Sequence, residues 1–323
     1  GVLSAMGEVN DTLGFKQCTI TNNSADSSGG VLYVSSDIEA LTIDSSTVSG
    51  NAGASGGVAY LAARLYGLAV KNNSLSDNSA ISGNGGVIGI NDTLTGTALL
   101  YNVIADNNSA ADNGGVLYST DDMTGRFIID SITANSNIAG QSGGFFYVPD
   151  TAHMRGIDLT ASSFIGQKAD ADGGVFHLGS ADTNTLTRVA SSQNRAEYGG
   201  LMYTGGESAI TIDDFTSNRD SAVNSGAAFY FSGATAFSMR EGTVRENFAT
   251  NSAGARFDNT SEVYITQSLF EDNDADGSSG CVFRASDSLY LRVDSTTFRD
   301  NRSFITRGGV FAILDDLLPL KGD

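Results

Sequence analysis

The sequence of 323 residues contains no tryptophan and only two prolines. Strong helix formers are scarce, and no segment of useful length repeats its apolar residues with the 3.6-residue period of an amphipathic helix. No apolar stretch approaches the roughly 20 residues that a membrane-spanning helix needs. Together these absences predict an all-β protein with no helical membrane span in this chain.

Positive charge is also in short supply. The chain has 18 basic residues against 37 acidic ones, which gives a formal net charge of −19. Such a surface repels nucleic acid and anionic lipid, so neither is an expected partner. The excess of carboxylates is typical of a highly soluble protein, and it is also compatible with calcium binding.

Glycine, in contrast, is abundant and periodic. A Gly-Gly pair followed by apolar residues recurs about every 28 residues along the whole chain. The series includes GGVLYV at Gly29 and GGVFAI at Gly308, and it passes through eroded forms such as SGAAFYF at Ser225 and SGCVF at Ser279. A repeat of this length predicts one continuous solenoid rather than two globular domains.

A second column precedes each Gly-Gly step by six to nine residues. An apolar residue is followed three positions later by an asparagine, as in Val48 and Asn51. Asparagine tolerates the left-handed backbone conformation, and stacked amides form hydrogen-bonded ladders. One repeat has Gln167 in this place, whereas Asn137 and Asn194 lack a clean apolar partner. The predicted ladder consists of Asn23, Asn51, Asn78, Asn107, Asn218, Asn247, Asn273 and Asn301.

These columns, with an alternating strand such as Leu41–Ile43 upstream of each asparagine, predict three short strands per repeat. We expect an all-β, right-handed, single-stranded parallel β-helix of about eleven coils of roughly 26–30 residues. We expect it to form a single domain over residues 1–323 and to be a segment of a longer protein. A leucine-rich repeat would need leucines where polar residues follow Asn23. Coils stack about 4.8 Å apart, so Cys18 and Cys281 lie too far apart for a disulfide.

The combination of columns resembles a known family. Repeats of GG with two apolar residues, alternating with FxxN, are similar to the polymorphic membrane protein (Pmp-type) repeats of chlamydial surface proteins. The resemblance extends from about Phe15 to Ile313. It implies a parallel β-helix that forms the passenger of an autotransporter and displays an adhesive surface.

The expected function is that of a non-catalytic structural or adhesive module, extracellular or at the cell surface. Its expected partners are a second copy of the chain, bound end to end or in a filament, or a cell-surface receptor or glycan. Contacts with them are expected in the variable loops 119–126, 148–156 and 179–185.

The alternative function is that of a carbohydrate-active enzyme, either a polysaccharide lyase or a hydrolase. Glycoside hydrolysis needs two carboxylates in reach of one bond, whereas adjacent pairs such as Asp213 and Asp214 point to opposite faces of a strand. No Ser-His-Asp order stands out, because His177 replaces a tyrosine within a strand and His153 lies in a loop. We therefore expect no catalytic residues.

No cofactor is required, but one turn suggests calcium. Asp272, Asp274 and Asp276 alternate before Gly277, as acids do at the opening of an EF-hand loop. The bidentate glutamate expected at the end of such a loop is replaced by Phe283, and an ordinary polar turn is the competing interpretation.

Several asparagines lie in Asn-x-Ser/Thr sequons, which accept N-linked glycans in secreted proteins. Asn107 and Asn301 also carry the sequon, but a ladder amide would be buried and a poor acceptor. The candidates are Asn10, Asn22, Asn72, Asn91 and Asn259.

Overall fold

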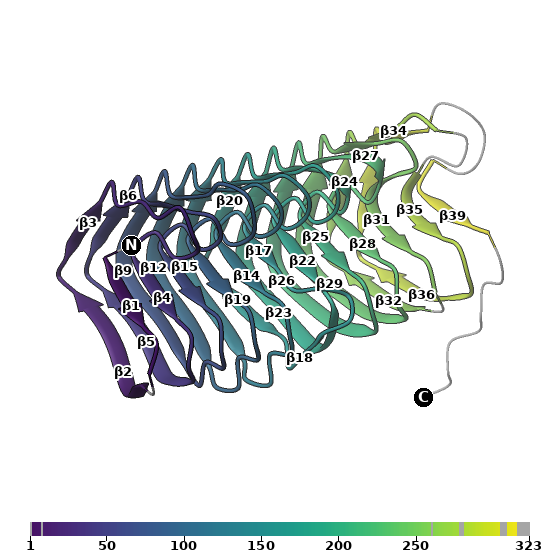
Figure 1. Cartoon of the computed structure of the whole chain (residues 1–323). Coiled ribbons are helices and arrows are strands. Elements are labelled where there is room, and N and C mark those ends of the chain that lie inside the picture. Colours follow the sequence, from purple (N-terminus) through teal and green to yellow (C-terminus); the bar gives the residue numbers. More distant parts are fainter. Residues whose placement is uncertain (1, 8, 260, 278–280, 304–308, 315–323) are drawn as a thin grey trace.

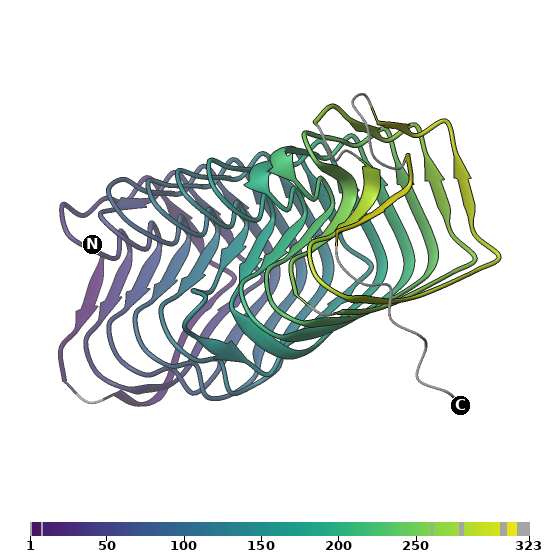
Figure 2. The ribbon, with the colours of Figure 1, turned by 90° about the vertical axis from the view of Figure 1, so that its right-hand side faces the viewer.

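The computed structural model describes residues 2–7, 9–259, 261–277, 281–303 and 309–314, and all of their regular structure is β. Consecutive coils stack into a parallel β-helix of about eleven turns, with β1 (Leu3–Ala5) and β39 (Phe311–Ile313) at opposite ends (Figure 1). Figure 2 shows the same succession of coils from the side of the C-terminal strands. The predicted fold class is confirmed. No helix in the described part of the chain is long and apolar enough to cross a bilayer.

The first of three parallel sheets is built from the strands that follow the Gly-Gly steps. In the described residues it contains β1, β4 (Leu32–Val34), β8 (Ala59–Leu61), β11 (Ile88–Ile90), β14 (Leu117–Ser119), β17 (Phe146–Tyr147), β22 (Phe176–Leu178), β25 (Met202–Thr204), β28 (Phe229–Phe231), β31 (Ser252–Phe257), β35 (Cys281–Ala285) and β39.

The second sheet is built from the very short strands that follow the ladder residues. It contains β7 (Ala52–Gly53), β10 (Ser79–Ala80), β13 (Ser109–Ala110), β16 (Ile138–Ala139), β21 (Lys168–Ala169), β24 (Arg195–Tyr198), β27 (Ser221–Ser225), β30 (Phe248–Ala249), β34 (Asp274–Ala275) and β38 (Arg302–Ser303).

The third sheet holds the long alternating strands, several of which are divided in two by a turn. It contains β2 (Val9–Lys16), β3 (Thr19–Thr21), β5 (Ile38–Asp44), β6 (Thr47–Ser49), β9 (Leu68–Ser76), β12 (Ala98–Asp106), β15 (Phe127–Asn135), β18 (His153–Met154), β19 (Ile157–Thr160), β20 (Ser163–Ile165), β23 (Ser180–Ser192), β26 (Ser208–Asn218), β29 (Thr235–Arg245), β32 (Ser261–Thr266), β33 (Leu269–Glu271), β36 (Leu289–Asp294) and β37 (Thr297–Arg299).

The two glycines of each Gly-Gly step have different tasks. The first adopts a positive φ, for example 68° at Gly114, which glycine reaches without a Cβ clash. The second lies against the next coil, because a Cβ on Gly115 would stand 2.1 Å from the backbone oxygen of Gly144. The repeated pair therefore reflects one turn conformation and one close contact between coils.

The other two turns of a coil use mainly polar residues in the left-handed region, with Gly50, Ala161 and Gly166 as exceptions. One turn bends the third sheet, as at Ser131 with φ 57°, and the other immediately precedes the ladder residue, as at Ser136 with φ 54°. These backbone conformations recur in register along the rod, so each coil follows nearly the same path as its neighbours.

Apolar side chains of the first and third sheets, together with the residues that follow the Gly-Gly steps, fill one continuous core, and Ala222, Ala227 and Ala249 form a small separate cluster. Its largest members are stacked phenylalanines, such as Phe127 and Phe146, whose rings lie 4.7 Å apart in an edge-to-face arrangement. Because a single coil cannot bury its apolar face, this core exists only in the stack.

A ladder of side-chain amides runs along the axis beside the core. Asn51 Nδ2 donates hydrogen bonds to Asn78 Oδ1 and to the backbone oxygen of Ile20, both at 2.9 Å. Asn51 Oδ1 in turn accepts hydrogen bonds from the backbone and side chain of Asn23. The ladder runs through Asn23, Asn51, Asn78, Asn108, Asn137, Gln167, Asn194, Asp220, Asn247, Asn273 and Asn301.

Two predicted members of the ladder were wrong. Asn107 is an exposed turn residue with φ 55°, and the adjacent Asn108 is the buried ladder residue. The prediction paired Asn107 with Ile104, which is 50% exposed. It was displaced by one residue, and a displacement of one residue moves a side chain to the other face of a strand.

The second error concerns Asn218, which ends β26 in a half-buried position. The ladder residue of this coil is Asp220, two positions later. A carboxylate is unusual at such a buried position, because it is costly without several hydrogen-bond donors.

Candidate functional site

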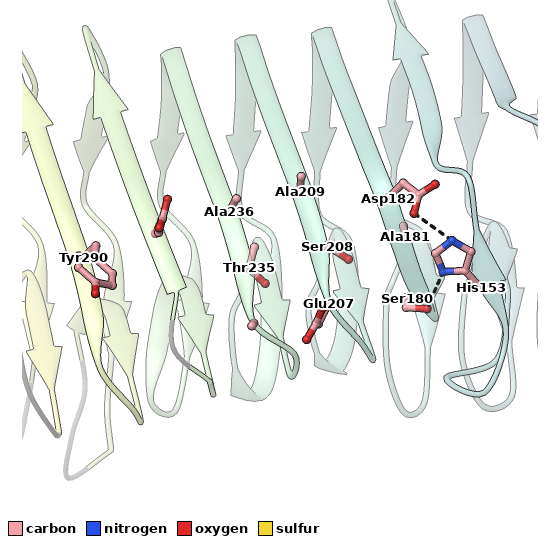
Figure 3. A pocket seen from close by; sticks show the side chains of 12 residues that line it. His153, Ser180, Ala181, Asp182, Glu207, Ser208, Ala209, Thr235, Ala236 and Tyr290 are labelled. Carbon is pink, nitrogen blue, oxygen red and sulfur yellow. Dashed lines mark hydrogen bonds and ion pairs between the residues drawn. The ribbon is translucent and has the colours of Figure 1, made fainter. Parts of the chain in front are cut away.

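A groove of about 830 Å³ lies on the outside of the third sheet and extends across several coils (Figure 3). Its lining comes from corresponding positions of consecutive coils, beginning at His153 and Ser180 and ending at Glu262 and Tyr290. Parallel pairing brings each of these positions next to its equivalent in the following coil. The groove is therefore aligned with the axis of the rod.

Small side chains form the floor of this groove. Ala209 pairs in register with Ala236, and the same column continues into Glu262 and then Tyr290. Two consecutive methyl groups leave a hollow, whereas the longer side chains that follow rise above the sheet and limit the groove at that end.

At the opposite end, three polar side chains from two coils meet. His153 Nδ1 lies 3.1 Å from Ser180 Oγ, and His153 Nε2 lies 3.0 Å from Asp182 Oδ1 (Figure 3). When Nε2–H donates to the carboxylate, Nδ1 accepts the hydrogen bond of the serine hydroxyl. The backbone N–H of His153 also donates to Asp122 Oδ1 at 2.7 Å.

These contacts have the order of a nucleophile, a base and an orienting carboxylate. The side chains of His153 and Asp182, however, are 54% and 59% exposed, so water competes for both contacts. Acyl transfer draws its strength from a desolvated, preorganised network. The arrangement is better suited to holding the loop 148–156 against the next coil.

Sequence reasoning missed this cluster. Its members come from the predicted variable loops 148–156 and 179–185, and Asp122 belongs to the third predicted loop, 119–126. His153 and Ser180 are register partners of adjacent coils. Only a correct alignment of those two coils, which differ in length (30 residues from Gly143 to Gly173 and 26 from Gly173 to Gly199), could have brought the residues together beforehand.

The charge in the groove is negative. Asp182, Glu207 and Glu262 contribute carboxylates, and no lysine or arginine belongs to the lining. Glu207 is exposed, and its carboxylate makes no ion pair with another described residue. The groove thus has a potential of the same sign as the whole chain.

On the core-facing side of β26, one hydroxyl has no partner among the described residues. Ser208 is only 7% exposed, and its hydroxyl makes no hydrogen bond with any described residue. Thr235, its register partner in the next coil, is satisfied because Oγ1 donates to the backbone oxygen of Gly233 at 3.0 Å. A buried hydroxyl without a partner is uncommon and costs free energy.

The second histidine of the chain also holds the loop 148–156. His177 stacks between Tyr147 and Tyr203, with ring centroids 4.6 and 4.7 Å away, and its Nε2 lies 3.0 Å from Asp150 Oδ1. It does occupy the tyrosine column of the first sheet, as the sequence indicated. Burial raises the pKa of nearby Asp172 to about 6, and the neighbouring His177 opposes that rise.

The calcium candidates do not form a cluster. Asp274 lies in β34 and pairs with Phe248 of the preceding coil, whereas Asp272 and Asp276 are exposed residues on either side of that strand. No group of three or more histidine, cysteine or acidic side chains suited to a metal ion occurs among the described residues. The segment is thus part of the parallel sheet rather than a loop that wraps around an ion.

The remaining predicted residues lie on the surface. Asp213 forms an ion pair with Arg240, and its neighbour Asp214 is a turn residue with φ 52°. Four sequon asparagines are exposed, namely Asn22, Asn72, Asn91 and Asn259, while the side chain of Asn10 lies outside the described residues.

Comparison of the chain with models of protein families, with curated proteins and with solved structures gave no match. The similarity to the chlamydial repeats therefore stays a prediction.

Proposed function

We propose that this chain is a non-catalytic structural and adhesive module that binds an extended glycan at the outside of a cell. The observation that carries the proposal is the axial groove, whose shallow alanine floor lies between polar side chains from successive coils. A rigid repeat presents such side chains at a constant spacing, which suits a partner that is itself a repeating polymer.

The physical properties of the groove favour binding over catalysis. Its best-ordered polar cluster, His153 with Ser180 and Asp182, is solvated rather than enclosed. The exposed carboxylates of Asp182 and Glu207, on the other hand, are suitable hydrogen-bond acceptors for sugar hydroxyls. An aromatic residue at one end, Tyr290, offers a ring for contact with the apolar face of a sugar.

A panel of immobilised oligosaccharides tests the proposal. We expect the chain to bind at least one oligosaccharide of five or more units and to release no reducing ends from it. Ala236→Arg fills the floor and should lower that affinity about tenfold or more, since it blocks access to the groove. Ala69→Arg, at an outward position of β9, is the matched control and should bind like the wild type. Absence of binding to every glycan, or equal loss in both variants, would refute the proposal.

A further inference from the structure

We propose that two copies of this chain associate side by side, with antiparallel axes, through an apolar patch on the outer face of β9, β12 and β15. The patch consists of Ala69, Leu99, Tyr101 and Ile128, none of which lines the groove. The proposal is therefore independent of glycan binding. It is carried by the apolar character of the patch, by the sizes of its side chains and by two charges that flank it.

The patch lies where the alternation of a strand normally places polar residues. In β12 the neighbours of Leu99 face the core, so Leu99 and Tyr101 face outward, and Tyr101 is 44% exposed. Leu99 pairs in register with Ala69 on one side and with Ile128 on the other, and both are partly exposed. A contiguous apolar patch on the surface is typical of an interaction site. The same column is polar on either side of the patch, with Thr42 before it and Asp158, Thr185, Thr211 and Ser238 after it.

Two opposite charges flank the patch in the column of Tyr101. Lys71 lies one coil before Tyr101, and Asp130 lies one coil after it. Neither forms an ion pair with a described residue. Asp44, in the coil before Lys71, accepts a hydrogen bond from Asn72 instead. Lys71 and Asp130 are about 10 Å apart along the axis, so their charges are available to a partner.

A twofold axis that lies in the contact plane, at right angles to the rod and level with Tyr101, fits these features. It reverses the order of the coils, so Lys71 of each copy faces Asp130 of the other. The small Ala69 of each copy lies opposite the larger Ile128 of the other, while Leu99 packs against its own equivalent. Charge and side-chain size are thus complementary between two identical surfaces.

A parallel arrangement of the two rods is unfavourable. Equivalent coils would then face each other, and Lys71 would meet Lys71 while Asp130 met Asp130. The antiparallel arrangement brings no like charges together in the columns of Leu99 and Tyr101. One coil beyond the flanking charges, for example, it places Asp44 opposite the uncharged Thr160.

Because the patch extends over only three coils, the dimer is weak. Contacts that bury less than about 1,200 Å² are typical of transient complexes, and we expect a dissociation constant of about 10–100 µM. At the submicromolar concentrations suited to the glycan panel the chain is then monomeric. Ala69→Arg therefore stays a valid control for glycan binding, although it lies in the dimer contact.

Sedimentation velocity between about 1 and 500 µM tests the proposal by an exchange of charges. Lys71→Asp and Asp130→Lys each place like charges at both symmetric contacts and should weaken dimerisation about tenfold or more. An equimolar mixture of the two variants should associate about as tightly as the wild type, because every contact again joins opposite charges. The double variant should recover the same affinity with itself.

Two matched controls distinguish the contact from a general change of charge or fold. Lys16 is also a register partner of Asp44, but it faces Thr187 in the dimer, so Lys16→Asp should keep the affinity within about twofold. Leu99→Arg should abolish the association, since it places a charge at the centre of the patch. Ser238→Arg, in the same column but beyond the overlap of the two copies, should have no effect.

Three results would overturn the proposal. The first is a wild-type chain that stays monomeric up to about 500 µM. The second is an association that Leu99→Arg leaves unchanged, which would assign it to the ends of the rod. The third is a mixture of Lys71→Asp and Asp130→Lys that fails to recover the affinity lost in each variant, while the melting temperatures of both match the wild type.

Discussion

Asn194 Nδ2 donates a hydrogen bond to Asp220 Oδ1 at 3.0 Å, so a carboxylate takes the place of an amide in the axial ladder. The hydroxyls of Ser191 and Ser217 donate to the other oxygen, Oδ2, at 2.6 and 2.7 Å. Each serine stands three positions before the ladder residue of its coil. In another coil, the apolar Val48 has this position before Asn51. The two polar replacements therefore accompany the buried acid and supply the donors that it needs.

Asp220 makes the stability of the protein depend on pH. Burial raises its pKa from 3.8 to about 6, against the opposing effect of hydrogen bonds from Ser191, Ser217 and Asn194. Because the folded-state pKa lies above the ordinary value, the folded protein holds this proton more tightly than the unfolded chain. Its contribution to stability is complete below pH 3.8 and is lost as the pH rises through 6, a change of about 3 kcal/mol.

Asp220→Asn should therefore raise the urea midpoint at pH 7.5 relative to the wild type, and the advantage should shrink at pH 4. The new amide can donate to the hydroxyl oxygens of Ser191 and Ser217 while Oδ1 still accepts from Asn194. Asp77→Asn, an exposed turn residue with φ 56°, is the control and should show no such pH-dependent difference. A variant less stable than the wild type at pH 7.5 would contradict the assignment.

Substitutions of Asn108 and of its neighbour Asn107 test which of the two is the ladder residue. Asn108 Nδ2 donates to Leu75 O and to Asn137 Oδ1, both at 2.9 Å, and Oδ1 accepts from Asn78. Asn108→Ala leaves these buried groups unpaired and should cost about 2–5 kcal/mol in chemical denaturation. Asn107→Gly should be nearly neutral, because glycine accepts φ 55° and the amide is exposed. A larger loss of stability in Asn107→Gly than in Asn108→Ala would mean that Asn107 is the ladder residue.

Two variants of His177 distinguish the contribution of ring stacking from that of the hydrogen bond to Asp150. His177→Ala opens a gap between Tyr147 and Tyr203 and should destabilise the protein by about 2–3 kcal/mol. His177→Phe keeps a ring in the stack and removes the buried Nδ1 that has no partner among the described residues, so its melting temperature should stay close to that of the wild type. Both variants release Asp150, and amide hydrogen exchange in the loop 148–156 should become faster. Unchanged exchange would show that the histidine does not hold this loop.

The close contact between coils is tested at the second glycine of a step. A Cβ on Gly115 would lie 2.1 Å from the backbone oxygen of Gly144, so Gly115→Ala must push two coils apart. We expect a loss of about 3 kcal/mol or more, measured by thermal unfolding. Gly7→Ala, where no atom lies within 4 Å of the added carbon, should be tolerated. Equal tolerance at both positions would mean that the stack adjusts easily.

The repeat made most of the fold predictable. The turn requires a positive φ at Gly114 and a close contact with the next coil at Gly115. Each requirement concerns a single residue, so glycine recurs in the sequence wherever this turn recurs. The ladder was harder to locate, because the coils differ in length and neighbouring asparagines such as Asn107 and Asn108 both match a spacing rule. Burial decides between them, and burial depends on which face of the strand meets the core.

The sequence by itself determined the parallel stack of about eleven coils, because a periodic apolar pattern can be buried only by its own next copy. The tertiary structure alone decided which polar residues meet. His153 joins Ser180 and Asp182, and Asp220 joins Ser191, through contacts between coils that are separated by about 30 residues of chain. Such contacts depend on the exact register of neighbouring coils, which loop insertions shift and which only packing of the whole stack establishes.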